Sequence, residues 1–337
     1  MAADPVRTTA ADIETLAHRA LTRAGASEVA AASLAKAIAA AEREGLASHG
    51  LGYLATYCEH LGCGKVIGGA VPNVATPAPG VVVVDAGSGF AHPAIDAGFA
   101  KLIPMAKSQG IAQLAIRNSY NCGVLGYHTE RLAAAGLVGL GFTNAPASIA
   151  PAGGTKPVLG TNPWSLAVPD GQGGAAIAID QSASVVAKSE VIKRSRSGEA
   201  IPLGWALGPD GQPTTDAAAG LKGTMVPAGG YKGVGSALLV EVMAACLSGA
   251  TLGMHASPFS GPVGGPPRTG QGFIAINPEI SSGGAFAERI TALLTAFGAE
   301  PKARVPGAGR RAARAKSDTQ GILVDRAIHE KCVALAG

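Results

Sequence analysis

The tetrapeptide Ala47-Ser48-His49-Gly50 is the part of the chain best suited to proton transfer. Imidazole titrates near neutral pH, so a histidine that is held in place can donate or accept a proton in carbonyl or imine chemistry. Among the seven histidines, His49 alone has a serine before it and a glycine after it, neighbours that suit a fixed ring. The simpler alternative is a histidine at a helix end whose ring bonds to backbone carbonyls. His49 is the first candidate for an acid–base residue.

Two glycine-rich segments resemble standard nucleotide-binding loops only in part. Gly87-Ser88-Gly89 stands where a Rossmann phosphate loop would begin, but the third glycine position holds His92. Asp85 ends the expected strand instead of lying about 20 residues further on. Lys232 follows a glycine pair without the Ser or Thr of a Walker loop, and the chain has no HExxH or GxSxG sequence. We therefore expect a nucleotide to be held without either standard loop, and we expect no metal site.

The composition fits an enzyme that binds small molecules. The 337 residues are 47% hydrophobic and only 4% aromatic, which predicts a full core of Ala, Val, Leu and Ile and few surface rings for stacking on bases. The net charge of +4 is mild, and much of the basic excess lies in residues 304–316. We therefore expect no nucleic-acid partner, whereas scattered Arg and Lys suit the phosphate of a cofactor.

The cysteines and the N-terminus indicate a cytoplasmic protein. No basic and then apolar leader opens the chain, and runs such as residues 81–84 are far too short to span a bilayer. The five cysteines are odd in number and form no CxxC pair, which favours reduced thiols. Cys122 lies in a loop that we expect to reach the site.

Apolar periodicity predicts a helical N-terminal unit. Thr9 and Asp12 resemble a helix cap, Gly25 ends the first helix, and Ser27 begins an alanine-rich second helix that runs towards Gly45. A third helix is expected over residues 53–61. Ser48 and His49 therefore lie at the junction between two helices.

The rest of the chain alternates strands and helices. Helices are expected over residues 93–108, 129–135, 185–195, 236–247 and 285–297, and strands over residues 80–85, 111–117, 137–143, 164–168, 175–180 and 272–277. We expect the apolar helix 236–247 to be buried, residues 196–230 to form a loop-rich excursion, and residues 304–337 to form a basic tail.

Seven short motifs, taken in order, resemble the malate/L-lactate dehydrogenase family that lacks a Rossmann fold. That family also contains ureidoglycolate and sulfolactate dehydrogenases and the piperideine- and pyrroline-2-carboxylate reductases. Each motif is weak alone, but their shared order from Ser48 to Gln271 is typical of the family, although it says little about the substrate. The motifs are Ser48-His49-Gly50; Asn118-Ser119; Gly160-Thr161-Asn162-Pro163; Asp180 with Ser182 and Ser184; Gly204-Trp205-Ala206 before Pro213-Thr214-Thr215-Asp216; Gly229-Gly230-Tyr231-Lys232-Gly233; and Thr269-Gly270-Gln271.

The resemblance implies an α/β fold that binds NAD(P) without a Rossmann domain. Its central sheet would be mixed or largely antiparallel, beside a helical N-terminal unit. The implied division is residues 1–75 for a helical substrate and dimer unit, 76–270 for the cofactor-binding domain, and 271–337 for a segment that returns to the first unit. Members of the family form dimers, so a homodimer is expected, with helix 236–247 and the alanine-rich helices as candidate interfaces.

The resemblance also assigns catalytic roles. His49 would donate the proton to the oxygen or nitrogen of the reduced carbon, with Ser48 and Asp180 as hydrogen-bonding partners that fix its tautomer. An ionised Asp180 near the ring would favour imidazolium, the form that donates. Alternatively, Asp180 caps the helix that follows its strand.

A nicotinamide cofactor is implied as well, with NADP slightly preferred over NAD. Asn162 and the backbone of Gly160 and Thr161 would meet the nicotinamide side, because glycine permits close approach. Lys232 would place a charge against the pyrophosphate or a ribose hydroxyl, and Arg310 or Arg311 would reach the adenosine end. Further contacts are expected from Asn144, Gln181 and Ser182. The alternatives are an ordinary Asn-Pro turn at residues 160–163 and a solvated lysine at position 232.

Two positions depart from the family pattern. Tyr53 stands where the family commonly has an arginine, the usual bidentate clamp for a carboxylate. Asn121 stands where the family commonly has a histidine, and an asparagine cannot donate a proton near neutral pH. Proton transfer would then fall to His49, and the substrate is not expected to be plain malate. Tyr53, Tyr120 and Asn121 are the candidate substrate residues.

Three functions remain open at this point, and the sequence slightly favours the first. The first is an NAD(P)-dependent dehydrogenase that interconverts a small 2-hydroxy acid, similar to malate, lactate or sulfolactate, and its 2-oxo acid. The second is an NAD(P)H-dependent reductase of cyclic imine 2-carboxylates, which needs only one proton donor. The third is a non-catalytic nucleotide-binding homologue. In the first two, the partner is a small carboxylate substrate and neither nucleic acid nor a membrane is expected.

Overall fold

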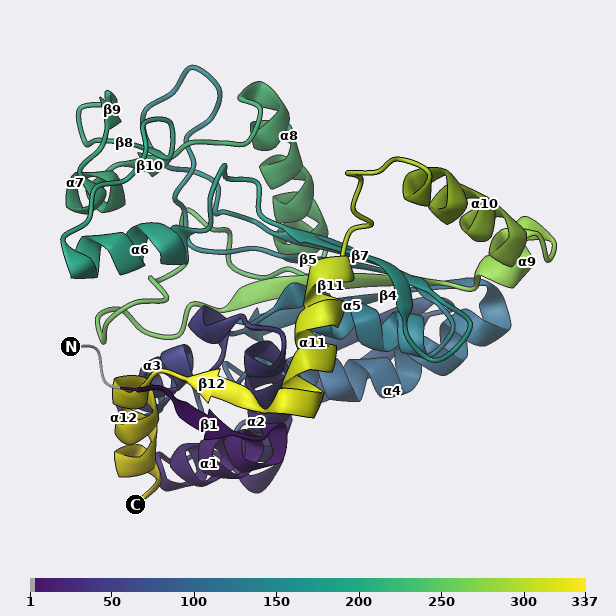
Figure 1. The fold of residues 1–337 in the computed structure, drawn as a ribbon, viewed down its shortest axis with the longest axis horizontal. Helices are drawn as coiled ribbons and strands as arrows, with labels where there is room; N and C mark the ends of the chain where they lie inside the picture. The colour runs from purple at the N-terminus through teal and green to yellow at the C-terminus, as the bar shows by residue number, and fades with distance from the viewer. Residues whose placement is uncertain (1–3) are drawn as a thin grey trace.

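A seven-stranded sheet lies at the centre of the chain in the computed structural model, which describes residues 4–337 (Figure 1). The strand order is β2-β3-β4-β11-β5-β6-β7, and only β3 and β4 run parallel. The predicted mixed, largely antiparallel sheet is confirmed. Its strands are β2 (Asn73–Ala78), β3 (Val81–Asp85), β4 (Ile111–Ser119), β5 (Val138–Thr143), β6 (Trp164–Pro169), β7 (Ala175–Gln181) and β11 (Thr269–Ile276).

Helices cover both faces of this sheet (Figure 1). α4 (Ala91–Gln109) and α5 (Leu125–Ala134) pack on one face, where Val82, Val84 and Leu114 join the core. On the other face lie α8 (Tyr231–Val240) and the π-helical turn η2 (Glu241–Cys246) that continues it. A Cβ at Gly270 would lie 2.0 Å from the Ala244 carbonyl oxygen, so the glycine is what lets η2 approach β11.

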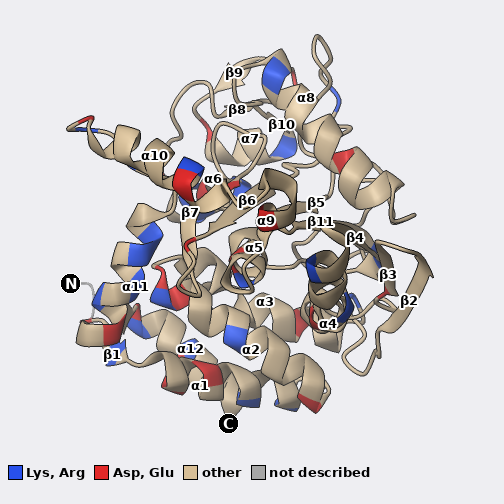
Figure 2. Cartoon of the chain, turned by 90° about the vertical axis from the view of Figure 1, so that its right-hand side faces the viewer, with Lys and Arg blue, Asp and Glu red and all other residues tan. Residues whose placement is uncertain are grey.

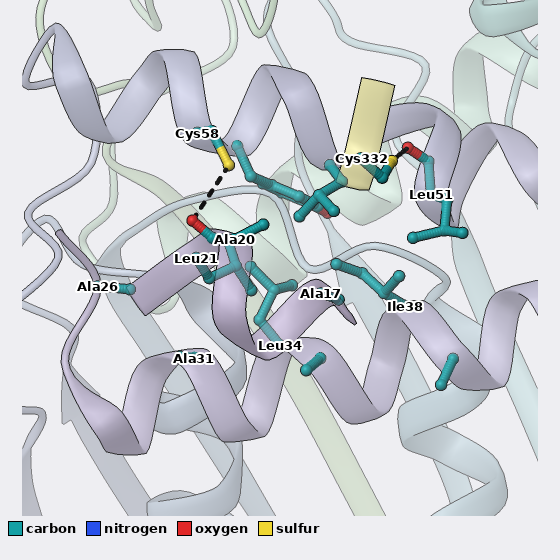
Figure 3. Close-up of a cluster of buried hydrophobic side chains, with 14 of the residues drawn as sticks. Ala17, Ala20, Leu21, Ala26, Ala31, Leu34, Ile38, Leu51, Cys58 and Cys332 are labelled. Atoms are coloured by element: carbon teal, nitrogen blue, oxygen red, sulfur yellow. Dashed lines mark hydrogen bonds between the residues drawn. The ribbon is translucent and has the colours of Figure 1, made fainter. Parts of the chain in front are cut away.

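The N-terminal helices form a separate core with the C-terminus. The unit contains α1 (Ala10–Arg23), α2 (Glu28–Arg43), α3 (Leu51–Gly62) and α12 (Arg326–Ala336), and β1 (Val6–Thr8) pairs with β12 (Ile322–Val324). Thr9 and Asp12 form the predicted capping box. Leu21, Leu34 and Leu51 are buried in this core, where the Cys332 thiol bonds to the Leu51 carbonyl (Figure 3). α2 and α3 are thereby held where Ser48 and His49 connect them.

Two expectations about the second half of the chain are wrong. Residues 304–337 are not a tail, because α11 (Ala308–Gln320) crosses from the sheet to the helical unit, where β12 and α12 follow it (Figure 1). Its basic side chains meet acidic partners just after the end of α2 and on α5, which a basic run in the sequence does not reveal.

Helix 236–247 is buried on one face only. Ala237, Val240 and Ala244 are buried, whereas Leu238 and Leu239 are both 54% exposed. The helix also begins five residues earlier than expected, at Tyr231, and its last turn is η2.

The remaining elements surround the sheet. α6 (Lys188–Ser197) begins three residues later than expected, and the loop-rich excursion contains α7 (Ala217–Lys222) and a small sheet of β8 (Ala206–Leu207), β9 (Pro213–Thr214) and β10 (Thr224–Met225). α9 (Pro278–Ser282) leads to α10 (Phe286–Gly298), which projects from the body (Figure 1). Within residues 4–337, no helix is long and apolar enough to cross a membrane. The division at residues 75 and 270 stays a prediction.

Candidate active site

His49 lies on a short 3-10 turn, η1 (Ala47–His49), between α2 and α3. Its Nδ1 lies 3.0 Å from the Ser48 hydroxyl oxygen, so the two predicted partners are in hydrogen-bond contact. Among the described residues, Nε2 has no hydrogen-bond partner and is free to meet a ligand. The ring is half-buried, and burial lowers the pKa of His49 below its ordinary value.

A residue that the sequence analysis did not single out fixes this junction. Glu42 is 5% exposed near the end of α2, and its Oε1 accepts the Leu51 N–H at 2.7 Å at the start of α3. Burial raises the pKa of Glu42. A Cβ at Gly50 would lie 2.4 Å from the same oxygen, so the glycine of the Ser-His-Gly motif makes room for this carboxylate. The sequence alone does not reveal the contact between Glu42 and Leu51, because it depends on how α3 turns back on α2.

The three predicted substrate residues lie together. Tyr53 is one helical turn beyond His49. Tyr120 and Asn121 lie beside the Tyr53 hydroxyl, and this hydroxyl donates to the Phe259 carbonyl at 2.8 Å. Burial raises the pKa of Tyr53 to about 12. Phe259 also packs on Tyr120, with ring centroids 5.6 Å apart. The surroundings of Tyr53 are therefore aromatic and neutral where the family commonly places a guanidinium.

Asp180 has partners other than His49. Its Oδ2 accepts the Gly126 N–H at 2.7 Å in the first turn of α5, whose own N-cap residue makes no side-chain cap. Asp180 therefore caps α5, and not the helix that follows its strand as the alternative interpretation suggested. Burial raises its pKa, although the Gly126 N–H and the nearby Arg310 act in the opposite direction. No hydrogen bond joins it to His49 in the described part of the chain, so that role stays a prediction.

The loop after β4 connects the two halves of the candidate site. Asn121 lies beside Tyr53, while the next residue, Cys122, lies close to Asp180 and Thr143. Cys122 is buried, and burial raises its pKa to about 12, which keeps the thiol protonated. The loop therefore contacts Tyr53 through Asn121 and lies close to Asp180 at Cys122.

Arg310 lies in an inward-facing ion cluster. Its guanidinium is 3.7 Å from Glu44 and 3.4 Å from Glu130, and Arg314 bonds to the same two carboxylates. Figure 2 shows the basic residues along α11 that supply this cluster. Arg310 is thus engaged beside Asp180 and joins the end of α2 to the sheet domain.

Two predicted cofactor residues meet at a buried carboxylate. Glu241, the first residue of η2, accepts hydrogen bonds from Asn144 Nδ2 at 3.3 Å, Asn162 Nδ2 at 2.7 Å and the Gly253 N–H at 2.7 Å. Asn162 Oδ1 accepts the Ala145 N–H, and its backbone has a φ of 38°, in the region that Asn tolerates best after Gly. The polar groups of both amides are used inside the protein. Glu241 could not be identified from the sequence, because it lies 79 residues from Asn162.

Other predicted cofactor residues lie on three adjacent segments. The Ala183 N–H bonds to the Thr161 carbonyl at 2.8 Å, and the Ala183 carbonyl accepts the Ala228 N–H at 2.8 Å. Segments 160–162, 181–184 and 228–233 are therefore neighbours. Gln181 is exposed at the end of β7, and the Ser182 hydroxyl is 3.1 Å from that of Ser184.

Gly160 begins the first of these segments, and Lys232 lies near the end of the third. A Cβ at Gly160 would lie 2.2 Å from the Ala145 carbonyl oxygen, so no larger residue fits this turn. Lys232 is exposed in the first turn of α8, after two glycines with positive φ. A cavity of about 740 Å³ lies away from these segments, among α1, α3, α12 and Arg196.

Comparisons with known proteins agree over 90% or more of the chain. The profile of the family described as Malate/L-lactate dehydrogenase matches residues 8–332. A (2R)-3-sulfolactate dehydrogenase (NADP(+)) of Chromohalobacter salexigens is 43% identical over 90% of both chains. A Delta(1)-pyrroline-2-carboxylate reductase of Ancylobacter novellus is 39% identical over 98% of both. The crystal structure of delta1-piperideine-2-carboxylate reductase from Pseudomonas syringae pv. tomato has a TM-score of 0.93 and 34% identity, covering 98% of this chain and 99% of that one.

Proposed function

Because the chain belongs to the malate/L-lactate dehydrogenase family and is an oxidoreductase, we propose that it reduces a C=N bond next to a carboxylate, with His49 as the proton donor. The observation that carries this proposal is the Ser48–His49 contact one helical turn from Tyr53, in a half-buried position. Of the three candidate catalytic residues, only these two are in direct contact.

The surroundings of Tyr53 favour a cyclic imine 2-carboxylate over a 2-oxo acid. The half-buried Tyr53 and Phe259 offer aromatic surface to the methylene groups of a small ring, and the buried ring of Tyr120 packs behind them. A malate- or sulfolactate-like substrate carries a second anionic group, which would favour a cation where this chain has Tyr53. The order of the two substrate classes is thus the reverse of the one that the sequence alone suggested. The 43% identity to a sulfolactate dehydrogenase keeps the hydroxy acid as the second candidate.

The proton transfer follows from the geometry of His49. The Ser48 hydroxyl holds Nδ1, which leaves Nε2 to carry the proton to the substrate nitrogen. Burial lowers the pKa of the ring, so imidazolium gives up this proton readily once formed. A bound reduced nicotinamide supplies the hydride to the substrate carbon. Asn121 and Tyr53 orient the carboxylate and the ring of the substrate.

The three adjacent segments fit a nicotinamide dinucleotide, and NADP(H) is favoured because the sulfolactate dehydrogenase relative is an NADP(+) enzyme. Gly160 lets the cofactor approach the backbone, and Lys232 at the start of α8 suits a phosphate. We assign Asn144 and Asn162 to holding the backbone of this turn through Glu241. Arg310, already paired with two carboxylates, is assigned to holding Asp180.

A homodimer is part of this proposal. The exposed leucines of α8 and the amphipathic helix α10, which has no buried residue, leave apolar surface uncovered in the single chain. A second copy would cover it. The five cysteines are free thiols, which fits the cytoplasm.

Oxidation of NADPH, followed at 340 nm, tests the substrate assignment. Δ1-pyrroline-2-carboxylate and Δ1-piperideine-2-carboxylate are compared with 3-sulfopyruvate, oxaloacetate and pyruvate. We expect kcat/KM for one imine to exceed that of each 2-oxo acid by about 100-fold or more. Preference for 3-sulfopyruvate would instead establish the hydroxy-acid function. Tight NADPH binding without turnover of any compound would indicate the non-catalytic homologue.

A further inference from the structure

The loop over residues 257–265 is fastened to the substrate end of the site. It connects the segment after η2 to β11, and the Ser257 hydroxyl bonds to the Gly265 carbonyl across its base. Its tip is open to solvent, where Val263 is 80% exposed. We name residues 257–265 the latch loop.

Three side chains from α3 and the turn after it hold the backbone of the latch loop. The Tyr53 hydroxyl donates to the Phe259 carbonyl at 2.8 Å, and His60 Nε2 lies 3.1 Å from the Gly261 carbonyl oxygen. Lys65 Nζ donates to the Pro258 carbonyl at 2.6 Å and to the Gly261 carbonyl at 2.9 Å. The loop is therefore bound to the helix that begins beside His49.

A buried lysine such as Lys65 is an unusual residue to hold the backbone of a loop. The residue is 1% exposed, and no carboxylate within residues 4–337 forms an ion pair with it. Burying an ammonium group is costly, and two backbone carbonyls and the charge of Glu59 beyond ion-pair distance only partly compensate for its lost hydration. A neutral side chain would fill this volume at lower cost. The arrangement indicates that the position of the loop matters beyond folding.

His60 links the latch loop to the aromatic side of the substrate site. Its Nδ1 bonds to the Tyr120 hydroxyl, while its Nε2 contacts the Gly261 carbonyl. Phe259 packs against the ring of Tyr120. The same imidazole therefore contacts both Tyr120 and the loop that carries Phe259.

We infer that Lys65 and His60 are positioning residues that hold the latch loop so that Phe259 closes the substrate pocket over the ring of a small cyclic substrate. The inference rests on the proposed function for the identity of that substrate. The contacts place the latch loop against Tyr53 and Tyr120 and leave the segments around Gly160 and Lys232 untouched. Loosening the loop therefore weakens substrate binding and spares cofactor binding.

The test compares Lys65→Met, which keeps most of the side-chain volume, with Lys36→Met at an exposed lysine of α2. In Lys65→Met, we expect amide hydrogen exchange within residues 257–265 to become about tenfold faster or more. KM for the preferred imine should rise about tenfold, while KM for NADPH stays within about twofold. Lys36→Met should match the wild type in every readout. Phe259→Leu, at a half-buried residue, should raise the imine KM while exchange in the loop stays normal. This variant tests the inference if Lys65→Met fails to fold.

The outcomes separate the latch from a purely structural role. Unchanged exchange over residues 257–265, or a lower melting temperature with an unchanged imine KM, overturns the inference. If the wild type turns over no substrate, the proposed function fails independently. Exchange then tests whether Lys65 fastens the loop, and unchanged exchange in Lys65→Met still refutes the inference.

Discussion

Replacing Glu241 with glutamine should weaken cofactor binding without touching the substrate pocket. The carboxylate accepts three hydrogen bonds, from Asn144, Asn162 and the Gly253 N–H. In Glu241→Gln, one oxygen keeps two of these bonds without the charge, and the new NH2 group faces the Asn162 Nδ2 donor. One charge-assisted bond is lost and two are weakened.

The structure sets the size of this effect. A hydrogen bond to a charged group contributes about 1.5–3 kcal/mol and a neutral one about 1 kcal/mol, so we expect a loss of about 3 kcal/mol of unfolding free energy. For a chain of this length, that lowers the melting temperature by about 4 °C. Asn162 also holds the Ala145 N–H beside Gly160, so a freed Asn162 lets the predicted cofactor turn shift.

Calorimetry of unfolding and NADPH titration measure both effects. We expect the Kd for NADPH to rise about tenfold, with the imine KM within about twofold of the wild type. Glu300→Gln, at an exposed glutamate, is the matched control. A normal melting temperature, or an imine KM that rises as much as the NADPH Kd, would refute the reasoning.

Three further predictions follow from single contacts. Imidazolium must donate the proton and burial lowers the pKa of His49, so kcat/KM for reduction should fall as pH rises, with a midpoint below the ordinary 6.5; a flat pH profile from pH 5 to 8 contradicts this. Leu238→Lys, at a position 54% exposed on α8, should give a monomer with a near-normal melting temperature by light scattering, and a persistent dimer would exclude this surface as the interface. Asp180→Ala removes the cap on Gly126 and should cost about 1 kcal/mol in denaturant unfolding, so unchanged stability would show that the cap is idle.

The parts of the fold that local sequence governs were predictable. The run of valines at residues 81–84 predicted β3, because a short apolar run between turn residues suits a buried strand. Thr9 and Asp12 predicted the start of α1, since a capping box acts within one turn. The Ser48–His49 contact was within reach for the same reason.

Features that depend on distant partners could not be predicted. α11 is a charged helix with no buried residue, and Arg310 and Arg314 become meaningful only beside Glu44 and Glu130. The helix over residues 236–247 carries apolar residues on every face beside Glu241, and its exposed leucines cannot be told from buried ones by sequence. Lys65 reads as a surface lysine until Pro258 and Gly261 lie against it.

The most direct test of the account is His49→Asn, measured with the preferred imine and NADPH. Asparagine can still hydrogen-bond but cannot donate a proton near neutral pH. We predict that kcat falls by a factor of about 10²–10⁴ and the pH dependence disappears, while NADPH binding stays normal and the control His329→Asn keeps full activity. A kcat within about threefold of the wild type would contradict the assignment of His49 as the proton donor.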